Sequence, residues 1–284
     1  MAGSALRLKR DLWMGAMHKQ SPLILITNDD GIHSPGLRAA AATLELMGEI
    51  LIVAPAQQQS GMGRSMPPFY EGSICRQTIQ VNGHEIEGYC VEGSPTQVVQ
   101  HGLVEIAPRK PDLVVSGINY GENIGSGITI SGTVGAAMEG ADFQIPALAV
   151  SLNTAPEHYL NPSETVDMRV AAYFLQFFAK RTLEVGLPPG ADLLKIDVPQ
   201  AATPQTPWRW TRVSRQRYFY PVKPHRRRPS DSGPLGFEIR IDLDTLEPDS
   251  DIRAVIVDGV VSVTPLTLDM TARVEAEMLG KWMA

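Results

Sequence analysis

The chain has 284 residues, with 25 Lys and Arg against 31 Asp and Glu, and a formal net charge of −6. This length allows one large buried core, and the acidic balance gives no general attraction for a nucleic-acid backbone, so we expect no duplex nucleic acid as a partner. The two cysteines, Cys75 and Cys90, have neither the number nor the spacing of a disulfide framework or a thiolate metal site, and we expect reduced thiols.

Residues 1–20 precede the first apolar segment and carry four basic residues, Arg7, Lys9, Arg10 and Lys19. They lack the apolar middle of a signal peptide, and no run elsewhere has the length of a transmembrane helix, so we expect a cytoplasmic enzyme with no membrane partner. Because neither their composition nor their spacing requires a place in a core, we predict a disordered extension over residues 1–20. Met14 and Met17 leave open a translation start further along the chain.

Residues 23–31 (LILITNDDG) join an apolar strand to two adjacent carboxylates and a glycine. Parallel strands are buried on both faces and consist of continuous apolar runs, and the ligands of such sheets bind beyond the carboxyl ends of the strands. Asp29 and Asp30 would therefore face a crevice, where two adjacent carboxylates need a cation or a shared proton. The alternative is a plain turn, because Asn, Asp and Gly dominate turns.

A helical segment at residues 35–47 and an apolar segment at residues 49–54 (EILIVA) predict a βαβ unit. The helix would begin at the Ser34-Pro35 pair, a cap followed by a proline. The crossover should be right-handed, which makes the sheet parallel at this point. The polar loop at residues 57–63 follows the second strand, and its Ser60 could reach the same crevice.

The chain then alternates β segments, helices and glycine-rich loops. Residues 73–81 and 84–91 flank Asn82-Gly83, a strong hairpin signal, and predict an antiparallel insertion. The next predicted elements are a helix from Ser94-Pro95 to about residue 106, a third core strand at 112–116, a glycine-dense loop at 117–127, a short helix of small residues at 131–140 and a fourth core strand at 147–152. Strands that alternate with helices in this way predict a parallel sheet.

After the fourth strand we predict a long helix at 165–184 and another strand at 191–198. Pro and Arg then become frequent, and the predicted elements are an accessory β region at 208–240, an apolar segment with a turn at 254–263 and an amphipathic helix at 269–283. We interpret the run around Arg226, Arg227 and Arg228 as an exposed loop rather than a nucleic-acid patch.

We therefore predict an α/β protein in three parts. After the extension, residues 21–200 would form a Rossmann-like catalytic core, a three-layer fold with a mostly parallel sheet. Residues 201–284 would form an accessory β-hairpin region and a C-terminal docking or swapped tail for oligomerisation. Exchange of such an element is a low-cost way to form the symmetric homo-oligomers that are common among soluble proteins.

Oxygen ligands gather at one edge of the predicted sheet. Asp29 and Asp30 follow the first strand, Ser60 the second and Asn119 the third. Two carboxylates, a hydroxyl and an amide carbonyl suit Mg²⁺ or Mn²⁺, with positions left for water and substrate. We expect these four residues to bind a divalent metal cation.

Ser131, Gly132 and Thr133 open a predicted helix beside those ligands. Free N–H groups and the positive end of the helix dipole bind anions there, and the glycine lets a phosphate approach the main chain. A metal and a phosphate site together predict phosphoryl transfer, with Asp30, Asn119 and Ser131 as the candidate catalytic residues. A plain N-cap is the alternative role of Ser131.

Four ordered motifs support a more specific prediction. They are ITNDDG at residues 26–31, VAP at 53–55 followed by Ser60-Gly61, VSGINYG at 115–121 and SGTVGAAMEG at 131–140. Together they resemble the SurE family, the survival-protein 5′/3′-nucleotidases, over residues 23–152 and again at VSVTPL, residues 261–266.

The resemblance implies a Rossmann-like domain that hydrolyses nucleoside 5′- or 3′-monophosphates to nucleoside and phosphate with a divalent metal. It implies that Asp29, Asp30, Ser60 and Asn119 are the metal ligands, and that C-terminal segments embrace a neighbour in a homodimer or homotetramer. Two other functions stay open: hydrolysis of polyphosphate or oligonucleotide ends at the same site, and a catalytically silent metal- and nucleotide-binding protein.

The chain departs from the family's usual pattern around the crevice. Residues 56–59 (AQQQ) stand where charged residues usually precede the loop serine, and Gln97 stands where an Asp commonly follows the Gly-Thr-Pro turn. Gly127 and Ile130 replace an Asp and a Tyr before Ser131. None of these changes removes an expected metal ligand, but they bear on substrate preference and rate.

Overall fold

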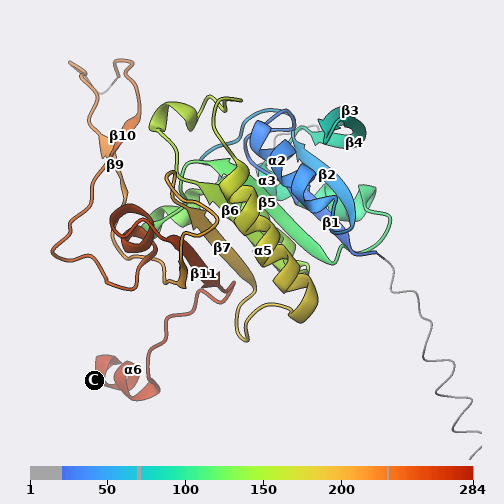
Figure 1. Ribbon diagram of the computed structural model, residues 1–284. Coiled ribbons are helices and arrows are strands. Elements are labelled where there is room, and N and C mark those ends of the chain that lie inside the picture. Colours follow the sequence, from blue (N-terminus) through green and yellow to red (C-terminus); the bar gives the residue numbers. More distant parts are fainter. Residues whose placement is uncertain (1–20, 69–71, 229, 284) are drawn as a thin grey trace, which may run out of the picture.

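A nine-stranded, mostly parallel sheet forms the centre of the protein (Figure 1). This computed structural model describes residues 21–68, 72–228 and 230–283, so the predicted extension over residues 1–20 and its alternative start sites lie outside the described residues. The strands of the sheet are β1 (Leu23–Thr27), β2 (Glu49–Pro55), β3 (Ile74–Val81), β4 (His84–Val91), β5 (Leu113–Tyr120), β6 (Ala147–Leu152), β7 (Leu193–Val198), β8 (Trp208–Trp210) and β11 (Val261–Leu266).

The strand order is β3-β4-β2-β1-β5-β6-β7-β11-β8. All neighbours from β4 to β7 are parallel, whereas β3 pairs with β4 and β11 pairs with β7 in the antiparallel sense. The chain leaves β1 toward β2 on one side and returns to β5 on the other. The carboxyl ends of β1 and β5 therefore flank a topological switch point, which is where open α/β sheets bind ligands.

Helices cover both faces of this sheet and complete three layers. They are α2 (Pro35–Leu44), α3 (Pro95–His101), α4 (Gly132–Asp142) and α5 (Arg169–Val185). Alternate residues of β1 explain the arrangement: Ile24 and Ile26 belong to the apolar core under α2 and α5, and Leu23 and Leu25 belong to the core under α3 and α4. The predicted Rossmann-like fold is confirmed.

Several predicted boundaries move. Strand β5 runs to Tyr120 rather than residue 116, so the glycine-dense loop begins later than expected. Ser34 occupies the N-cap of α2 but makes no side-chain capping bond, whereas Ser94 and Gln97 form a complete capping box at α3. The apolar segment before β11 is a π-helical turn, Arg253–Val257.

Cys75 and Cys90 form a disulfide, so the expectation of reduced thiols is wrong. The hairpin of β3 and β4 pairs these residues directly opposite each other, with their Cα atoms 5.1 Å apart. This separation lies within the range that a disulfide needs. The register of the hairpin, rather than any motif in the sequence, brings the two sulfur atoms together.

The segment after residue 200 contributes to the central sheet as well as to accessory structure. Strands β8 and β11 extend the sheet beyond β7, whereas β9 (Phe219–Val222) and β10 (Gly236–Ile239) form a separate two-stranded ribbon. The side chains of Arg226, Arg227 and Arg228 are exposed between these two strands. The terminal helix, α6 (Ala276–Met283), is shorter than predicted and stands apart from the sheet in Figure 1. Among the described residues, none of the helices has both the length and the apolar composition of a membrane-spanning segment.

Replacement of Gly36 by alanine should destabilise the fold. A Cβ at this position of α2 would lie 2.0 Å from the carbonyl oxygen of Ile118, so the helix would have to move away from β5. We expect Gly36→Ala to lower the free energy of unfolding by roughly 2–3 kcal/mol, as overpacking does in other cores. Urea denaturation measures the change.

Gly236→Ala is the matched control, because a Cβ there meets no atom within 4 Å. It should change the free energy of unfolding by about 0.5 kcal/mol or less. Equal stability of the two variants would show that the contact between α2 and β5 is not tight.

Candidate functional site

A cavity of about 280 Å³ lies at the carboxyl ends of the central strands, and we call it the strand-end cavity. It collects residues from the segment after β1, from the loop after β2, from the end of β5 and from the start of α4. The sequence-predicted site residues that line it are Asp29, Ser60, Asn119 and Ser131. The fold thus brings together residues that are up to 102 positions apart in the chain.

Asp29 follows β1 and is only 4% exposed. Burial raises the pKa of its carboxyl group, although a hydrogen bond from Thr133 Oγ1 to Asp29 Oδ1 (2.5 Å) opposes this shift. Gly132 makes the contact possible, because a Cβ on it would lie 2.7 Å from the Asp29 side chain. The start of α4 therefore contacts the Asp29 carboxylate directly, and the Thr133 hydroxyl donates its hydrogen to it.

Asp30 is also buried and has one oxygen atom without a partner. Gln58 Nε2 donates to Asp30 Oδ1 (3.1 Å) and also to the carbonyl oxygen of Tyr159 (2.9 Å), whereas Asp30 Oδ2 has no hydrogen-bond partner. Burial, and then the negative charge of Asp29, raise the pKa of Asp30 well above its ordinary value. A buried carboxylate oxygen with no donor is costly unless a cation or a proton meets it.

Ser60 and Asn119 contribute neutral oxygen atoms. The amide of Gln59 donates to the carbonyl oxygen of Asp29 (2.7 Å) and so ties the exposed Ser60 loop to the end of β1. Asn119 Nδ2 donates to the carbonyl oxygen of Gly121 (2.8 Å), and this bond fixes the orientation of the side-chain amide. The pairing of β5 with β6 shifts register just before Asn119, a type of irregularity that re-aims side chains at the end of a strand.

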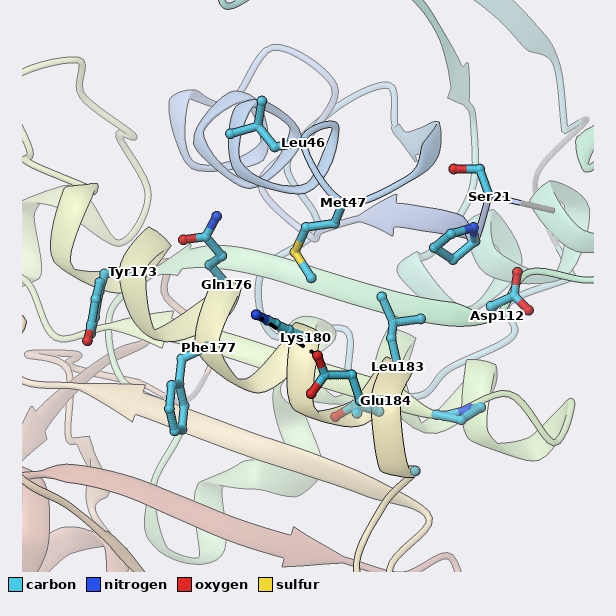
Figure 2. Close-up of a pocket in the computed structure, with 14 residues that line it drawn as sticks. Ser21, Leu46, Met47, Asp112, Tyr173, Gln176, Phe177, Lys180, Leu183 and Glu184 are labelled. Carbon is cyan, nitrogen blue, oxygen red and sulfur yellow. Dashed lines mark ion pairs between the residues drawn. The ribbon is translucent and has the colours of Figure 1, made fainter. Parts of the chain in front are cut away.

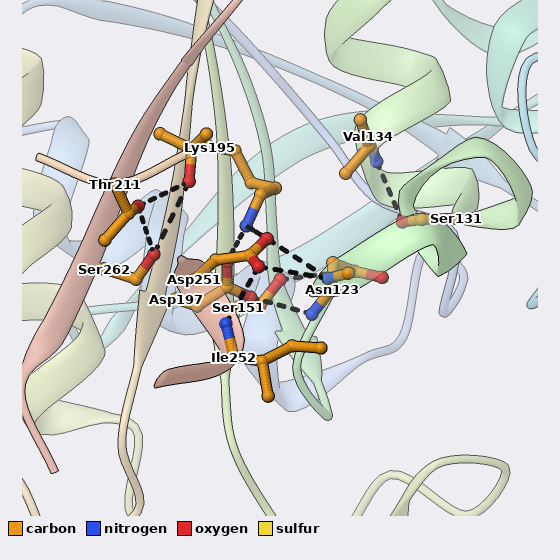
Figure 3. A network of polar contacts seen from close by, with 12 residues as sticks. Asn123, Ser131, Val134, Ser151, Lys195, Asp197, Thr211, Asp251, Ile252 and Ser262 are labelled. Carbon is orange, nitrogen blue, oxygen red and sulfur yellow. Dashed lines mark hydrogen bonds and ion pairs between the residues drawn. The ribbon is translucent and has the colours of Figure 1, made fainter. Parts of the chain in front are cut away.

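Ser131 is the N-cap of α4 and lines the cavity. Its Oγ accepts a hydrogen bond from the amide of Val134 (3.1 Å), as Figure 3 shows, so the plain capping role that the sequence left open is present. A serine hydroxyl that accepts this bond keeps its own hydrogen free to donate. Gly132 and Thr133 contact Asp29 instead and are not among the residues that line the cavity.

The donor set suits a hard divalent cation. Asp29, Ser60 and Asn119 line the cavity, whereas Asp30, the second desolvated carboxylate, follows Asp29 in the chain but is not among the lining residues. All four side chains offer oxygen atoms. Among the described residues no group of three or more His, Cys, Asp or Glu side chains could hold a metal, so nitrogen- or sulfur-rich sites of the zinc type have no candidate there. A cation at this edge would depend on both Asp29 and Asp30.

Sequence reasoning missed the second half of the cavity wall. Glu122 is buried and accepts hydrogen bonds from Tyr159 (3.0 Å), Tyr218 (2.6 Å) and Asn153 (2.5 Å). Burial and the charge of Glu122 raise the pKa of both tyrosines, which remain donors. The sequence places Glu122 in the glycine-dense loop, but nothing in it links that loop to residue 218.

Aromatic rings close this side of the cavity. Phe219 and Phe237 come from the β9–β10 ribbon and lie 4.9 Å apart between ring centroids, and Phe219 also meets Tyr159 edge to face at 6.5 Å. Gly127 and Ile130, two of the positions that depart from the family pattern, line the same cavity. One end of the cavity is therefore acidic and polar, and the other is aromatic.

A larger cavity of about 1010 Å³ lies at the opposite edge of the sheet. Figure 2 shows Ser21, Asp112 and the end of α5 around it, with Lys180 paired to Glu184 at 4.0 Å. These residues lie at the amino ends of the parallel strands, whereas ligands of such sheets bind at the carboxyl ends. The smaller cavity, which contains the buried carboxylate, is therefore the better candidate for chemistry.

Comparisons with known proteins show the family of this chain. A family model described as "Survival protein SurE" matches residues 24–220. The chain is 40% identical to the "5'-nucleotidase SurE" of Thermococcus kodakarensis over 91% of this chain and 97% of that protein, and 44% identical to the one of Methanocella arvoryzae over 88% and 93%. Among solved structures, a SurE protein from Aquifex aeolicus matches with a TM-score of 0.72 and 29% identity, over 93% of this chain and 100% of that one.

The metal-free protein should release protons when it binds Mg²⁺ or Mn²⁺. Burial raises the pKa of Asp29 and Asp30, so both carboxyl groups keep protons at a higher pH than ordinary carboxyls, and a cation must displace them. The affinity should fall as the pH is lowered through the raised pKa values, by up to about tenfold per pH unit for each proton released. Calorimetry in two buffers of different ionisation enthalpy measures both quantities.

Asp142→Asn, which changes an exposed carboxylate paired with Arg64, should leave affinity and proton release as they are. An affinity that does not change with pH down to the ordinary carboxyl range would contradict the assignment of this pair as the cation site.

Proposed function

The chain belongs to the SurE family and is a 5′-nucleotidase, and on that premise we propose that the strand-end cavity is its active site. The reaction is hydrolysis of nucleoside 5′- and 3′-monophosphates to nucleoside and phosphate. Asp29, Asp30, Ser60 and Asn119 hold the divalent cation, Mg²⁺ or Mn²⁺. The single observation that carries this proposal is Asp30 Oδ2, a buried carboxylate oxygen without a partner beside a second buried carboxylate.

The chemistry divides between the cation and the chain. When bound, the cation would act as a Lewis acid that polarises the phosphoryl oxygens and lowers the pKa of the attacking water. Asp30 and Asn119 orient that water toward the phosphorus atom. Ser131 donates its free hydroxyl hydrogen to a phosphoryl oxygen, where negative charge develops in the transition state. Thr133 holds Asp29 in place through its 2.5 Å hydrogen bond.

The aromatic end of the cavity suits the nucleoside half of the substrate. Phe219 and Phe237 offer ring faces to a base, and stacking of this kind is worth about 1–3 kcal/mol per base in proteins that bind single strands. Tyr159 closes the same side with its ring edge toward Phe219. Stacking distinguishes bases weakly, so this wall favours several bases rather than one.

The C-terminal segment supports assembly into a homodimer or homotetramer. Large apolar side chains are exposed on it, including Met270, Met278 and Trp282, of which Trp282 is 82% exposed. Exposed apolar groups on an extended tail are typical of segments that dock on a neighbouring copy. We further propose a cytoplasmic location, where nucleoside monophosphates arise.

Substitution of either acidic ligand should abolish activity without loss of the fold. Asp30→Asn removes a ligand charge at the edge of the sheet, and Asp29→Asn does the same beside it. We expect metal-dependent hydrolysis of nucleoside monophosphates to fall to background in both variants. Assays of the wild-type protein with polyphosphate test the alternative substrate, and assays with EDTA show whether hydrolysis needs the metal. Normal turnover in both variants, with unchanged thermal unfolding, would rule out the metal assignment.

Ser131→Ala should lower kcat by roughly 10- to 100-fold, because it removes one donor to the developing charge. Metal affinity should stay the same. Ser94→Ala is the matched control: it removes the N-cap hydroxyl of α3, which costs about 1 kcal/mol of stability but lies outside the cavity. A similar kcat loss in both variants would mean that Ser131 acts only as a helix cap.

Phe237→Ala should raise KM for nucleoside monophosphates about tenfold, because one stacking face is lost. Hydrolysis of methyl phosphate, which has neither base nor sugar, should not change. Leu235→Ala is the control, since Leu235 lies next to the same ribbon strand but is 89% exposed. Equal KM values for Phe237→Ala and the wild-type protein would remove the aromatic wall from the substrate site.

A further inference from the structure

A fully buried ionic cluster lies beside the strand-end cavity. Lys195 Nζ is 2.5 Å from Asp197 Oδ2 and 3.2 Å from Asp251 Oδ2, and all three side chains are 0% exposed. Figure 3 shows Lys195 between the two carboxylates, one from β7 and the other from the segment before the π-helical turn. We call these three residues the charged lock.

The carboxylates of this lock bind backbone amides of the cavity wall. Asp197 Oδ1 accepts a hydrogen bond from the amide of Asn123 (2.7 Å), and the two oxygens of Asp251 accept from the amide of Gly125 (3.3 and 3.2 Å). Asn123 lines the strand-end cavity directly, and Gly125 opens the 3₁₀ helix Gly125–Ile130. Two buried carboxylates therefore hold this wall through its backbone amides.

Asp251 also holds the aromatic side of the cavity. Asp251 Oδ1 accepts from the amide of Ser214 (2.9 Å), four residues before Tyr218, whose hydroxyl donates to Glu122. One residue therefore fixes both the loop that carries Glu122 and Asn123 and the segment that leads to Phe219. By contrast, the phosphoryl end of the cavity depends on β1, β5 and α4, which do not contact the lock through any of these bonds.

Such a cluster is not needed for stability alone. A buried ionic triad loses more in desolvation than a hydrophobic triad, and its replacement by apolar residues often stabilises a protein. Burial by itself would lower the pKa of Lys195, but Asp197 and Asp251 raise it, so the ammonium group stays charged. Lys195 therefore places a positive charge between the two carboxylates that accept the amides of the wall.

We propose that Lys195, Asp197 and Asp251 are positioning residues that fix the Asn123–Gly125 wall and the Phe219 side of the cavity around the nucleoside half of the substrate. This inference rests on the proposed function for the identity of the substrate. The lock acts on recognition of the nucleoside, not on the phosphoryl chemistry. A defect in it should therefore appear in KM for nucleotides.

Asp251→Asn tests this proposal in the full-length protein. The variant keeps the shape and leaves Lys195 balanced by Asp197, but in either orientation of the new side-chain amide its NH₂ group replaces an oxygen that accepts from Gly125, so two donors face each other there. We expect KM for a nucleoside monophosphate to rise about tenfold, as loss of a hydrogen bond to a charged group does. Turnover of methyl phosphate should stay within about twofold of the wild-type value.

Amide hydrogen exchange gives a readout that does not depend on activity. The amides of Asn123 and Gly125 should lose protection in Asp251→Asn, whereas the core strands should keep theirs. Asp249→Asn is the matched control, because Asp249 is two positions away and makes a surface ion pair with Arg212. It should change neither KM nor exchange.

The outcomes separate the two proposals. Absence of metal-dependent nucleotide hydrolysis in the wild-type protein would contradict the proposed function, and unchanged exchange at Asn123 and Gly125 would overturn the lock regardless of activity. Equal losses on nucleotide and methyl phosphate would also overturn it. If Asp251→Asn does not fold, Asp197→Asn leaves Lys195 balanced by Asp251 and tests the bond to the Asn123 amide by the same measurements, and failure of both variants to fold would show that the lock serves folding only.

Discussion

The repulsion between two adjacent buried carboxylates, Asp29 and Asp30, is the constraint on which the site depends. The sheet places both at the end of β1, where burial removes the water that would otherwise screen them. Each of the surrounding contacts reduces this cost in part: Thr133 donates to Asp29, and Gln58 donates to Asp30. These donors leave Asp30 Oδ2 without a partner, so a cation or a proton at that point would reduce the cost of its burial.

The donors come from elements that are distant in sequence, which makes the site a product of the whole fold. Thr133 belongs to α4, on one face of the sheet, and Gln58 to the loop after β2. The close approach of Gly132 to Asp29 and of Gly36 to β5 shows that helices on both faces are packed tightly against the central strands. A small shift of α2 or α4 would therefore alter these close contacts near Asp29 and at the end of β5.

The order of strands and helices could be predicted from local patterns. Apolar runs, the Ser-Pro helix starts and the Asn82-Gly83 turn each identify one element without reference to the rest, and residues at strand ends identified the polar half of the cavity. The disulfide was also accessible in principle: Cys75 and Cys90 are each seven residues from their side of that turn, so a two-residue hairpin must pair them.

The aromatic half of the cavity and the charged lock could not be predicted in the same way. Glu122 meets Tyr218, and Gly125 meets Asp251, across 96 and 126 positions of the chain. Such pairings depend on where β11 and the segment before it return to the sheet. The sequence near each of these residues does not specify where that return occurs, and β11 joins the sheet antiparallel to β7.

The separation of the β9–β10 ribbon from the central sheet has an evolutionary consequence. Phe219 and Phe237 are carried by two strands that pair only with each other, so mutations in the ribbon can alter the shape of the aromatic wall without disturbing the strands that carry the acidic residues. Selection can thus diversify the aromatic end of the cavity while the acidic end is inherited intact. A single scaffold of this kind is well suited to give rise to enzymes of different specificity after gene duplication.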